Sequence, residues 1–251
     1  MGYLSLESKS GKAPGGFNYP LHEIGVPFIF MNSVGSQRDL ETIMHEGGHA
    51  VHSFLVRDLE LVEFKNTPSE VAELASMTME LLTTDYWNEF YNEEDLKRAK
   101  KELLEGIVKI LPWIASVDKF QHWIYENPEH TPKERKNTWK SIMEKFGSSA
   151  IDWSNWEDSK NISWQKQLHI FEVPFYYIEY GIAQLGALAI WKNYKENGKE
   201  ETIQQYTNAL KLGYTKDIKE IYEIAGIKFD FSKEYIRELM SFVKNELDKL
   251  E

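Results

Sequence analysis

The sequence predicts a mainly α protein, with many helices and a small β-sheet near its N-terminus. Up to Asn32, short alternating apolar segments are separated by Gly, Pro and Lys turns, which is typical of strands. Beyond Asn32, apolar residues recur mostly at the helical period. The chain has 251 residues, of which 42% are hydrophobic, so it can bury a core and has the composition of a folded globule.

Three strands are expected before Asn32, in the segments YLSLES (3–8), GGFNYPL (15–21) and VPFIFMN (26–32). A peptide can add as a strand to an exposed sheet edge through main-chain hydrogen bonds. GKAPGGFNYP (11–20) is a candidate for such an edge, because its glycines permit close backbone approach. An ordinary turn is an equally good interpretation of the same residues.

The first helix is expected from Gln37 to about Arg57. Its apolar residues fall on one face, namely Leu40, Ile43, Met44, Val51, Phe54 and Leu55. The next helix begins at the capping box TPSE (67–70) and is expected to run to about Tyr91. A third helix follows the cap residue Asn92 and passes Pro112, where a kink is expected.

A second capping box, TPKE (131–134), starts a helix that should end near Gly147, before an irregular Trp-rich stretch. The later helices are predicted from their end signals: a long one from Pro174 to Gly198, two shorter ones ending near Gly213 and Gly226, and a last one capped by Ser232. The sequence shows no repeat, linker or clear boundary, so residues 1–251 are predicted to form a single domain.

Charge and composition exclude several classes of function. The formal net charge is −11, and an acidic surface repels phosphate backbones, so no nucleic-acid partner is expected. The chain has no cysteine, which excludes disulfides, thiolate nucleophiles and Cys-based zinc sites. No apolar run is long enough to span a bilayer, so no membrane association is expected and we predict a cytoplasmic protein.

The chemistry is concentrated in HEGGH (45–49). His45 and His49 are four residues apart, so a helix places both imidazoles on one face, near enough to share a metal ion. Glu46 completes the H-E-x-x-H pattern, in which the histidines bind zinc and the glutamate is the general base. Gly47 and Gly48 each cost the helix about 1 kcal/mol relative to Ala. We expect a neighbouring element to approach both glycines more closely than a Cβ would permit.

Zinc in a catalytic site needs a third protein ligand and an open position. Glu70, Glu73 and Glu80 share one face of the next helix, and any of them could reach the two histidines if the helices run antiparallel. Their neighbours are mostly apolar, which indicates buried carboxylates that need a cation or hydrogen-bond donors.

Three segments in this order resemble the thimet oligopeptidase and oligoendopeptidase F family of zinc metallopeptidases: HEGGHAVH (45–52), PSEVAELASMTMELL (68–82) and HIFEVPFYYIEYGIAQ (169–184). GKAPGGF and PFIFMN, ahead of them, are similar to the bacterial oligoendopeptidase F branch. The resemblance extends over essentially the whole chain. It implies a multi-helical, zincin-like catalytic domain that corresponds to the C-terminal portion of the family.

The resemblance implies a zinc-dependent endopeptidase that hydrolyses short oligopeptides with one zinc ion. Its ligands would be His45, His49 and Glu73, with Glu46 as the base that activates water. Glu80 would hold one of the ligands in place. His52 would pack nearby without binding the metal, because a fourth ligand would close the site.

The oxygen of an attacked carbonyl needs hydrogen-bond donors as its negative charge develops. Tyr177 and Tyr180 are three residues apart and project from one helical face, and a phenol donates well at neutral pH. The resemblance implies that His169, Tyr177 and Tyr180 bind substrate and stabilise the transition state. Tyr176 is expected to pack its ring in the core.

Members of the family are usually more than twice this long, and a long N-terminal helical region forms the opposite wall of their substrate channel. We therefore expect this chain to be a fragment, a natural short form, or a protein whose wall comes from another chain. The alternative function is a catalytically weak metal- or peptide-binding fragment that needs a partner chain. The face normally covered by the N-terminal region could also drive self-association.

Overall fold

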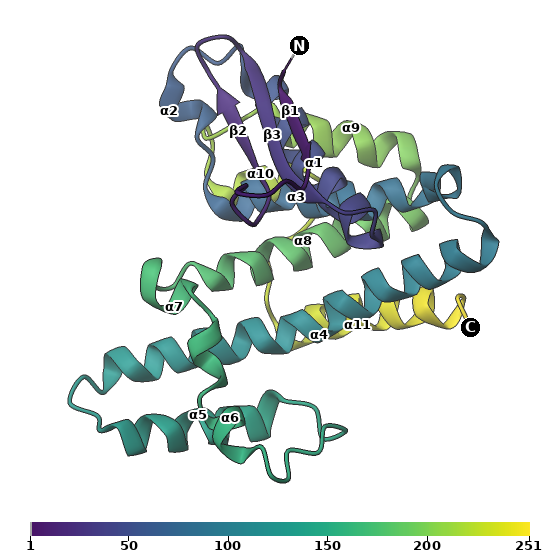
Figure 1. The fold of residues 1–251 in the computed structure, drawn as a ribbon. Coiled ribbons are helices and arrows are strands. Elements are labelled where there is room, and N and C mark those ends of the chain that lie inside the picture. Colours follow the sequence, from purple (N-terminus) through teal and green to yellow (C-terminus); the bar gives the residue numbers. More distant parts are fainter. Residues whose placement is uncertain (1) are drawn as a thin grey trace. The chain divides into compact units, whose positions relative to one another are not determined.

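The computed structural model describes residues 2–251 and confirms a mainly α fold with a small sheet (Figure 1). The strands are β1 (Leu4–Glu7), β2 (Phe17–Leu21) and β3 (Val26–Ser33). The helices are α1 (Gln37–Val56), α2 (Val62–Lys65), α3 (Ser69–Thr83), α4 (Glu93–Glu126), α5 (Pro132–Phe146), α6 (Glu157–Asn161), α7 (His169–Glu172), α8 (Tyr177–Glu196), α9 (Lys199–Leu210), α10 (Ile218–Ile224) and α11 (Lys233–Asp248), with short 3-10 helices η1 (Thr84–Glu89) and η2 (Ser163–Lys166).

The chain divides into two compact units. The first comprises Met1–Leu103 and Ile182–Glu251, and the second comprises Leu104–Gly181. Helices α4 and α8 each begin in one unit and end in the other. The first unit contains the sheet, α1 and α3, and the second contains α5, α6 and α7.

The sheet has the strand order β1-β3-β2, with β1 parallel and β2 antiparallel to β3. Ile29 and Met31 alternate into the core along β3, which packs on α1. Lys12 ties the loop after β1 to both neighbouring strands, because its ammonium donates to the backbone oxygens of Ser5 and Met31. The three predicted strands are therefore confirmed, and β2 lies at an edge of the sheet.

Helix α1 lies between the sheet and α3, and a glycine sets its distance from α3. A Cβ on Gly48 would lie 2.6 Å from the Cα of Ser76 and 2.8 Å from the carbonyl oxygen of Ala75. The predicted close approach is thus confirmed for Gly48. It is wrong for Gly47, around which a Cβ would meet no described atom within 4 Å.

The buried face of α1 differs from the apolar stripe of its sequence. Glu46, Gly48, His52 and Val56 are the buried residues of this helix, whereas Val51 and Phe54 of the stripe are exposed. The helical period finds the buried face only when burial follows hydrophobicity. Here polar side chains with partners on neighbouring elements occupy the buried side.

Several helix boundaries follow their local signals. Asn92 accepts from the backbone N–H of Asp95, Thr131 and Glu134 form the expected capping box, and Ser232 caps α11. Both predicted ends of α3 are wrong. Helix α3 gives way to η1 after Thr83 instead of reaching Tyr91, and it begins at Ser69, one residue later than the Thr67 cap implies.

Helix α8 begins at Tyr177, three residues after the predicted start at Pro174. Phe175 has a φ of +63°, which is outside the right-handed helical region, so the chain turns before α8 can begin. The backbone N–H of Tyr176 donates to the carbonyl of Val173 within this turn. The turn therefore determines the residue at which α8 begins.

The second unit has its own aromatic core. Trp139 of α5 is fully buried, and its ring centroid lies 5.1 Å from Phe120 and 5.5 Å from Trp113, both on α4. The Trp139 indole donates to Ser163 at 3.0 Å. Trp164 joins the cluster at 5.2 Å from Phe120. These contacts bring the irregular Trp-rich stretch against α4 and α5.

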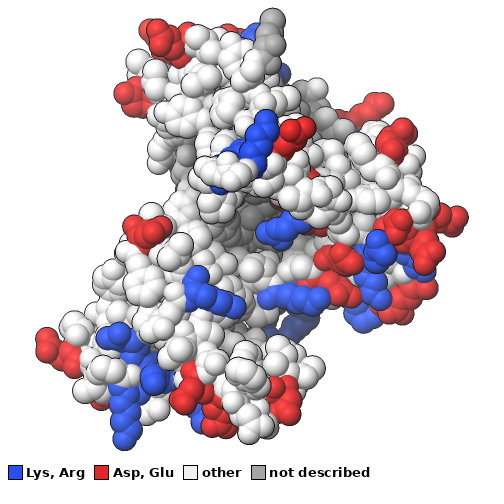
Figure 2. All heavy atoms as spheres, viewed as in Figure 1, with Lys and Arg blue, Asp and Glu red and all other residues white. Residues whose placement is uncertain are grey.

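On the face drawn in Figure 2, acidic side chains are interspersed with basic ones. Such mixing is typical of a solvated surface. Among residues 2–251, none of the helices combines the length and the apolar composition that crossing a membrane would require.

Candidate metal centre

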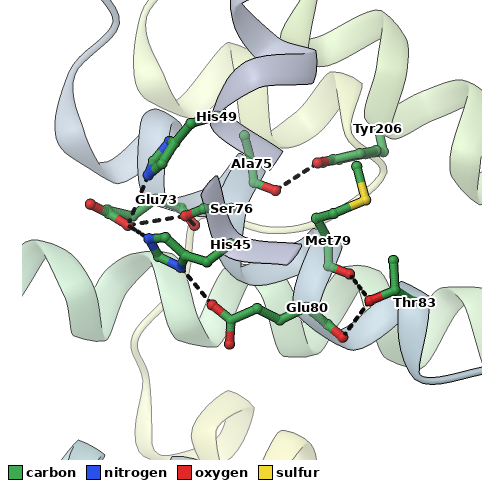
Figure 3. Close-up of polar contacts among 9 residues, drawn as sticks. All are labelled: His45, His49, Glu73, Ala75, Ser76, Met79, Glu80, Thr83 and Tyr206. Carbon is green, nitrogen blue, oxygen red and sulfur yellow. Dashed lines mark hydrogen bonds and ion pairs between the residues drawn. The ribbon is translucent and has the colours of Figure 1, made fainter. Parts of the chain in front are cut away.

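Helices α1 and α3 bring two imidazoles and one carboxylate together (Figure 3). His45 Nε2 lies 3.3 Å from Glu73 Oε2, and His49 Nε2 lies 3.8 Å from the same oxygen. One ligand atom from each of these residues lies within 4.8 Å of the others. Two histidine nitrogens and a carboxylate oxygen are the donor set that catalytic zinc sites use, so the three residues fit a zinc ion.

The three acids of α3 that could supply the third ligand differ in what they contact. Glu73 faces both histidines, and it is 8% exposed. Glu80 instead contacts the other ring nitrogen of His45, with Oε1 at 2.6 Å from Nδ1. Glu70 is not part of the group that could hold a metal. The geometry therefore agrees with the ligand set that the resemblance implies.

Hydrogen bonds on both sides orient the candidate ligands. Glu80 contacts Nδ1 of His45, and this contact orients the ring so that its Nε2 atom faces Glu73. Ser76, one helical turn after Glu73, is fully buried and its hydroxyl donates to Glu73 Oε2 at 3.0 Å. Our sequence reasoning missed Ser76, although its position three residues after Glu73 puts it on the same face of a helix.

The two histidines favour the ionised form of the Glu73 carboxylate. Burial raises the pKa of Glu73, but the hydrogen bond with His45 and the nearby histidines outweigh it, so this pKa is lowered. Burial lowers the pKa of His49 to about 4. Burial also lowers the pKa of His45, yet Glu73 and Glu80 outweigh that effect and raise it to about 10. Two carboxylates therefore face the His45 imidazole, and their negative charge would favour a divalent cation there.

Glu46 is 5% exposed and stands beside this group on α1. Burial raises its pKa, against the smaller opposite effects of His45 and of a hydrogen bond from the Asn18 backbone. Its Oε2 atom has no hydrogen-bond partner among the described residues. A carboxylate with a raised pKa and a free oxygen is suited to accept a proton from a water molecule.

The chain next to Glu46 is the start of β2. A Cβ on Gly16 would lie 3.3 Å from Glu46 Oε1 and 3.2 Å from the Thr42 side chain. The glycine therefore permits the edge strand to approach the carboxylate, as the candidate-edge interpretation of this segment requires. Whether a peptide adds to that edge stays a prediction.

His52 lies one turn beyond His49 and is 5% exposed. Burial lowers its pKa to about 4, so the imidazole is neutral at pH 7. It does not belong to the group of three that could hold a metal. This agrees with a packing role in which His52 is not a ligand.

The predicted carbonyl-binding residues form a cluster in the second unit. The His169 ring centroid lies 4.9 Å from that of Tyr177 and 5.8 Å from that of Tyr180, and Tyr177 and Tyr180 are 5.6 Å apart. Burial raises the pKa of Tyr177, so its phenol is protonated at neutral pH. Tyr176, which was expected in the core, is half-buried and lies 5.4 Å from Tyr180. The roles of these residues stay predictions.

Comparison with known proteins identifies the family that the chain matches. The family model described as "Peptidase family M3" matches residues 1–241. Oligopeptidase PepF of Bacillus subtilis (strain 168) is 24% identical over 255 residues, which are 99% of this chain and 37% of that protein. An oligoendopeptidase F homolog of Borreliella burgdorferi is 25% identical over 99% of this chain and 42% of its own length.

A solved structure described as PZ peptidase A with inhibitor 2 superposes with a TM-score of 0.85 and 31% identity. The match covers 98% of this chain and 44% of that one. The chain therefore spans less than half the length of the relatives that it matches.

Proposed function

Because the chain belongs to peptidase family M3, we propose that it is the catalytic part of a zinc-dependent endopeptidase that hydrolyses oligopeptides. The observation that carries this proposal is the convergence of His45, His49 and Glu73, with the buried Glu46 beside them. Two of the compared relatives are described as an oligopeptidase and an oligoendopeptidase, which supports oligopeptides as the substrate class.

We assign the ion to His45, His49 and Glu73, which fit it by donor type and spacing. When bound there, zinc supplies Lewis acidity that makes water a nucleophile at neutral pH. Glu46 takes a proton from the attacking water and passes it to the leaving amine, which is general base and then general acid catalysis. Its raised pKa supports both halves of this role.

In the same proposal, Tyr177, Tyr180 and His169 donate hydrogen bonds to the peptide carbonyl, whose oxygen becomes negative in the transition state. Support comes from their clustering and from the protonated state of the Tyr177 phenol. The alternative of a metal- or peptide-binding fragment is less favoured, because a pure binding site has no need of Glu46.

The test is cleavage of an internally quenched fluorescent peptide by the purified chain. We expect cleavage that a chelator abolishes and added zinc restores. Glu46→Gln should lower kcat by about 10²–10⁴, the usual contribution of a general base, while zinc content is unchanged. Glu63→Gln, on the exposed surface of α2, is the matched control and should cleave normally.

Zinc bound at one ion per chain with no cleavage by the wild-type protein would favour the binding-fragment alternative. Full activity of Glu46→Gln would contradict the assignment of the base.

A further inference from the structure

A chain of hydrogen bonds in the second unit ends at His169. The Trp113 indole Nε1–H donates to Gln167 Oε1 at 3.0 Å, and Gln167 Nε2 lies 2.5 Å from His169 Nδ1. Gln167 is half-buried, and so are Trp113 and His169. No sequence pattern indicates this arrangement, since Trp113 is far from Gln167 along the chain.

The indole determines which way the amide of Gln167 faces. An indole nitrogen is a donor only, so it must be met by the amide oxygen. The amide nitrogen is then the atom turned toward His169, and it too is a donor only. Nδ1 of His169 must therefore accept this hydrogen bond and carry no proton.

A neutral imidazole has one N–H, so an unprotonated Nδ1 leaves the proton on Nε2. We propose that Gln167 is a positioning residue, which Trp113 orients so that its amide keeps the His169 proton on Nε2, ready to be donated to a peptide carbonyl. This inference rests on the proposed function in one respect, namely the role of His169 as a donor.

Packing holds Trp113, the first residue of this chain of hydrogen bonds, in place. The ring of Trp113 meets the buried Trp139 edge to face at 5.5 Å, and the Lys166 ammonium lies 4.3 Å from the centroid of the Trp113 ring. Trp113 also lowers the pKa of the Tyr177 phenol, against the larger effect of burial. Trp113 thus affects two of the three predicted carbonyl-binding residues, His169 through Gln167 and Tyr177 directly.

The surroundings of His169 favour the neutral ring. Burial lowers its pKa, and Glu172 on the same helix opposes this more weakly. Among the described contacts, the other titratable groups packed against the ring are the phenols of Tyr176, Tyr177 and Tyr180. A neutral His169 with a fixed tautomer can donate without an imidazolium being formed.

The test is the protonation of His169 by NMR in the full chain, with the imidazole ¹⁵N signals assigned from a His169→Gln sample. In the wild type, above the pKa of His169, we expect the shift of an unprotonated Nδ1 and a protonated Nε2. Gln167→Glu presents a carboxylate, which only accepts, so the proton should move to Nδ1. The new charge should raise the pKa of His169 by about one unit or more.

Gln165→Glu is the matched control, because it adds the same charge two residues away on an exposed side chain. It should leave the tautomer of His169 unchanged. Trp113→Phe removes the indole donor and should release the amide of Gln167, which gives a mixture of tautomers. Circular dichroism shows whether each variant keeps its fold, and Gln167→Glu still tests the idea if Trp113→Phe unfolds.

A wild-type Nδ1 that carries a proton would overturn the proposal, as would an unchanged tautomer in folded Gln167→Glu. Kinetics add an independent readout: kcat/KM of Gln167→Glu should fall at least tenfold, and its pH profile should shift with the NMR pKa. If the wild type cleaves no peptide, the proposed function fails while the NMR result still decides the role of Gln167.

Discussion

At the scale of residues, the candidate metal centre depends on which group contacts each ring nitrogen of His45. Glu73 approaches Nε2 and Glu80 approaches Nδ1, so one imidazole lies between two carboxylates. The partner on Nδ1 fixes the ring and makes Nε2 a better ligand. Glu80 is therefore expected to affect metal affinity even though we do not count it among the ligands.

We predict that Glu80→Gln weakens zinc binding by about 10–100-fold, the usual effect of losing such a supporting carboxylate. The side chain keeps its size but loses its charge. Zinc affinity measured by competition with a chromophoric chelator gives the result. Glu89→Gln, exposed at the end of η1, serves as the control, and equal affinities of the two variants would show that Glu80 does not support His45.

The site residues could be predicted to different extents. H-E-x-x-H identifies His45, Glu46 and His49 because about one turn of helix sets the spacing of the two histidines that share a metal ion. Spacing alone left Glu70, Glu73 and Glu80 open, since all three share a face of α3, and the resemblance was needed to choose. Ser76 and Gln167 each lie within three residues of the side chain that they contact, but neither belongs to a recognised motif, so the pattern of the sequence did not single them out.

At the scale of elements, the two adjacent glycines of α1 have different roles. We predict that Gly48→Ala destabilises the protein by about 1–3 kcal/mol, because a Cβ there overlaps the backbone of α3. Gly47→Ala meets no described atom within 4 Å and should stabilise the helix by up to about 1 kcal/mol. Urea denaturation of the two variants measures both changes, and each is the control for the other.

Gly48→Ala should also weaken zinc binding, because α1 and α3 each carry part of the ligand set. Equal stability of Gly47→Ala and Gly48→Ala would mean that α1 and α3 do not approach each other as closely as described.

Asp85 of η1 joins two further helices, since it pairs with Lys195 on α8 and Lys199 on α9. Burial raises the pKa of Asp85, but the hydrogen bonds from both lysines outweigh this effect, and the pKa is lowered. A lowered pKa means that the carboxylate stabilises the fold above its unfolded value of about 3.9. That stability is lost as the pH falls through the folded value.

We therefore predict that Asp85→Asn lowers the free energy of unfolding by about 1 kcal/mol at pH 7, a figure kept small because Lys199 is largely exposed. The difference from wild type should shrink below about pH 4 and vanish in stronger acid. Chemical denaturation at several pH values measures it. Asp58→Asn, whose carboxylate is exposed, should show no such trend, and a difference for Asp85→Asn that grows toward low pH would contradict the pairing.

The elements could be predicted where short-range signals decide them. Capping residues such as Asn92, Thr131 and Ser232 act within one turn, and they mark the starts of α4, α5 and α11. The end of α3 and the start of α8 depend on tertiary turns, which periodicity does not encode. The predicted buried face of α1 was wrong because the polar residues Glu46 and His52 lie on its enclosed side, where hydrophobicity alone would not place them.

At the scale of the whole molecule, the chain comprises two compact units, and the candidate ligands all belong to the first. Metal binding should therefore stabilise that unit through α1 and α3. At a zinc concentration about 100 times Kd, linkage adds about 2.7 kcal/mol, which corresponds to roughly 100-fold slower exchange of amides that open with the site.

We predict that hydrogen exchange measured by mass spectrometry slows on zinc addition in peptides from α1 and α3. Peptides from α5, in the second unit, are the internal control and should exchange as before. Uniform slowing over both units would indicate that the ion acts through global folding, and slowing confined to the second unit would place the ion elsewhere.

The central claim is that α1 and α3 together hold one divalent ion, and zinc titration by calorimetry of the wild type, Glu73→Gln and Glu70→Gln tests it most directly. Glu70 lies on the same helix, outside the metal-binding group, and is the matched control. We predict one zinc per chain for the wild type, the same affinity for Glu70→Gln, and an affinity lower by at least about tenfold for Glu73→Gln. Wild-type affinity in Glu73→Gln would contradict the account.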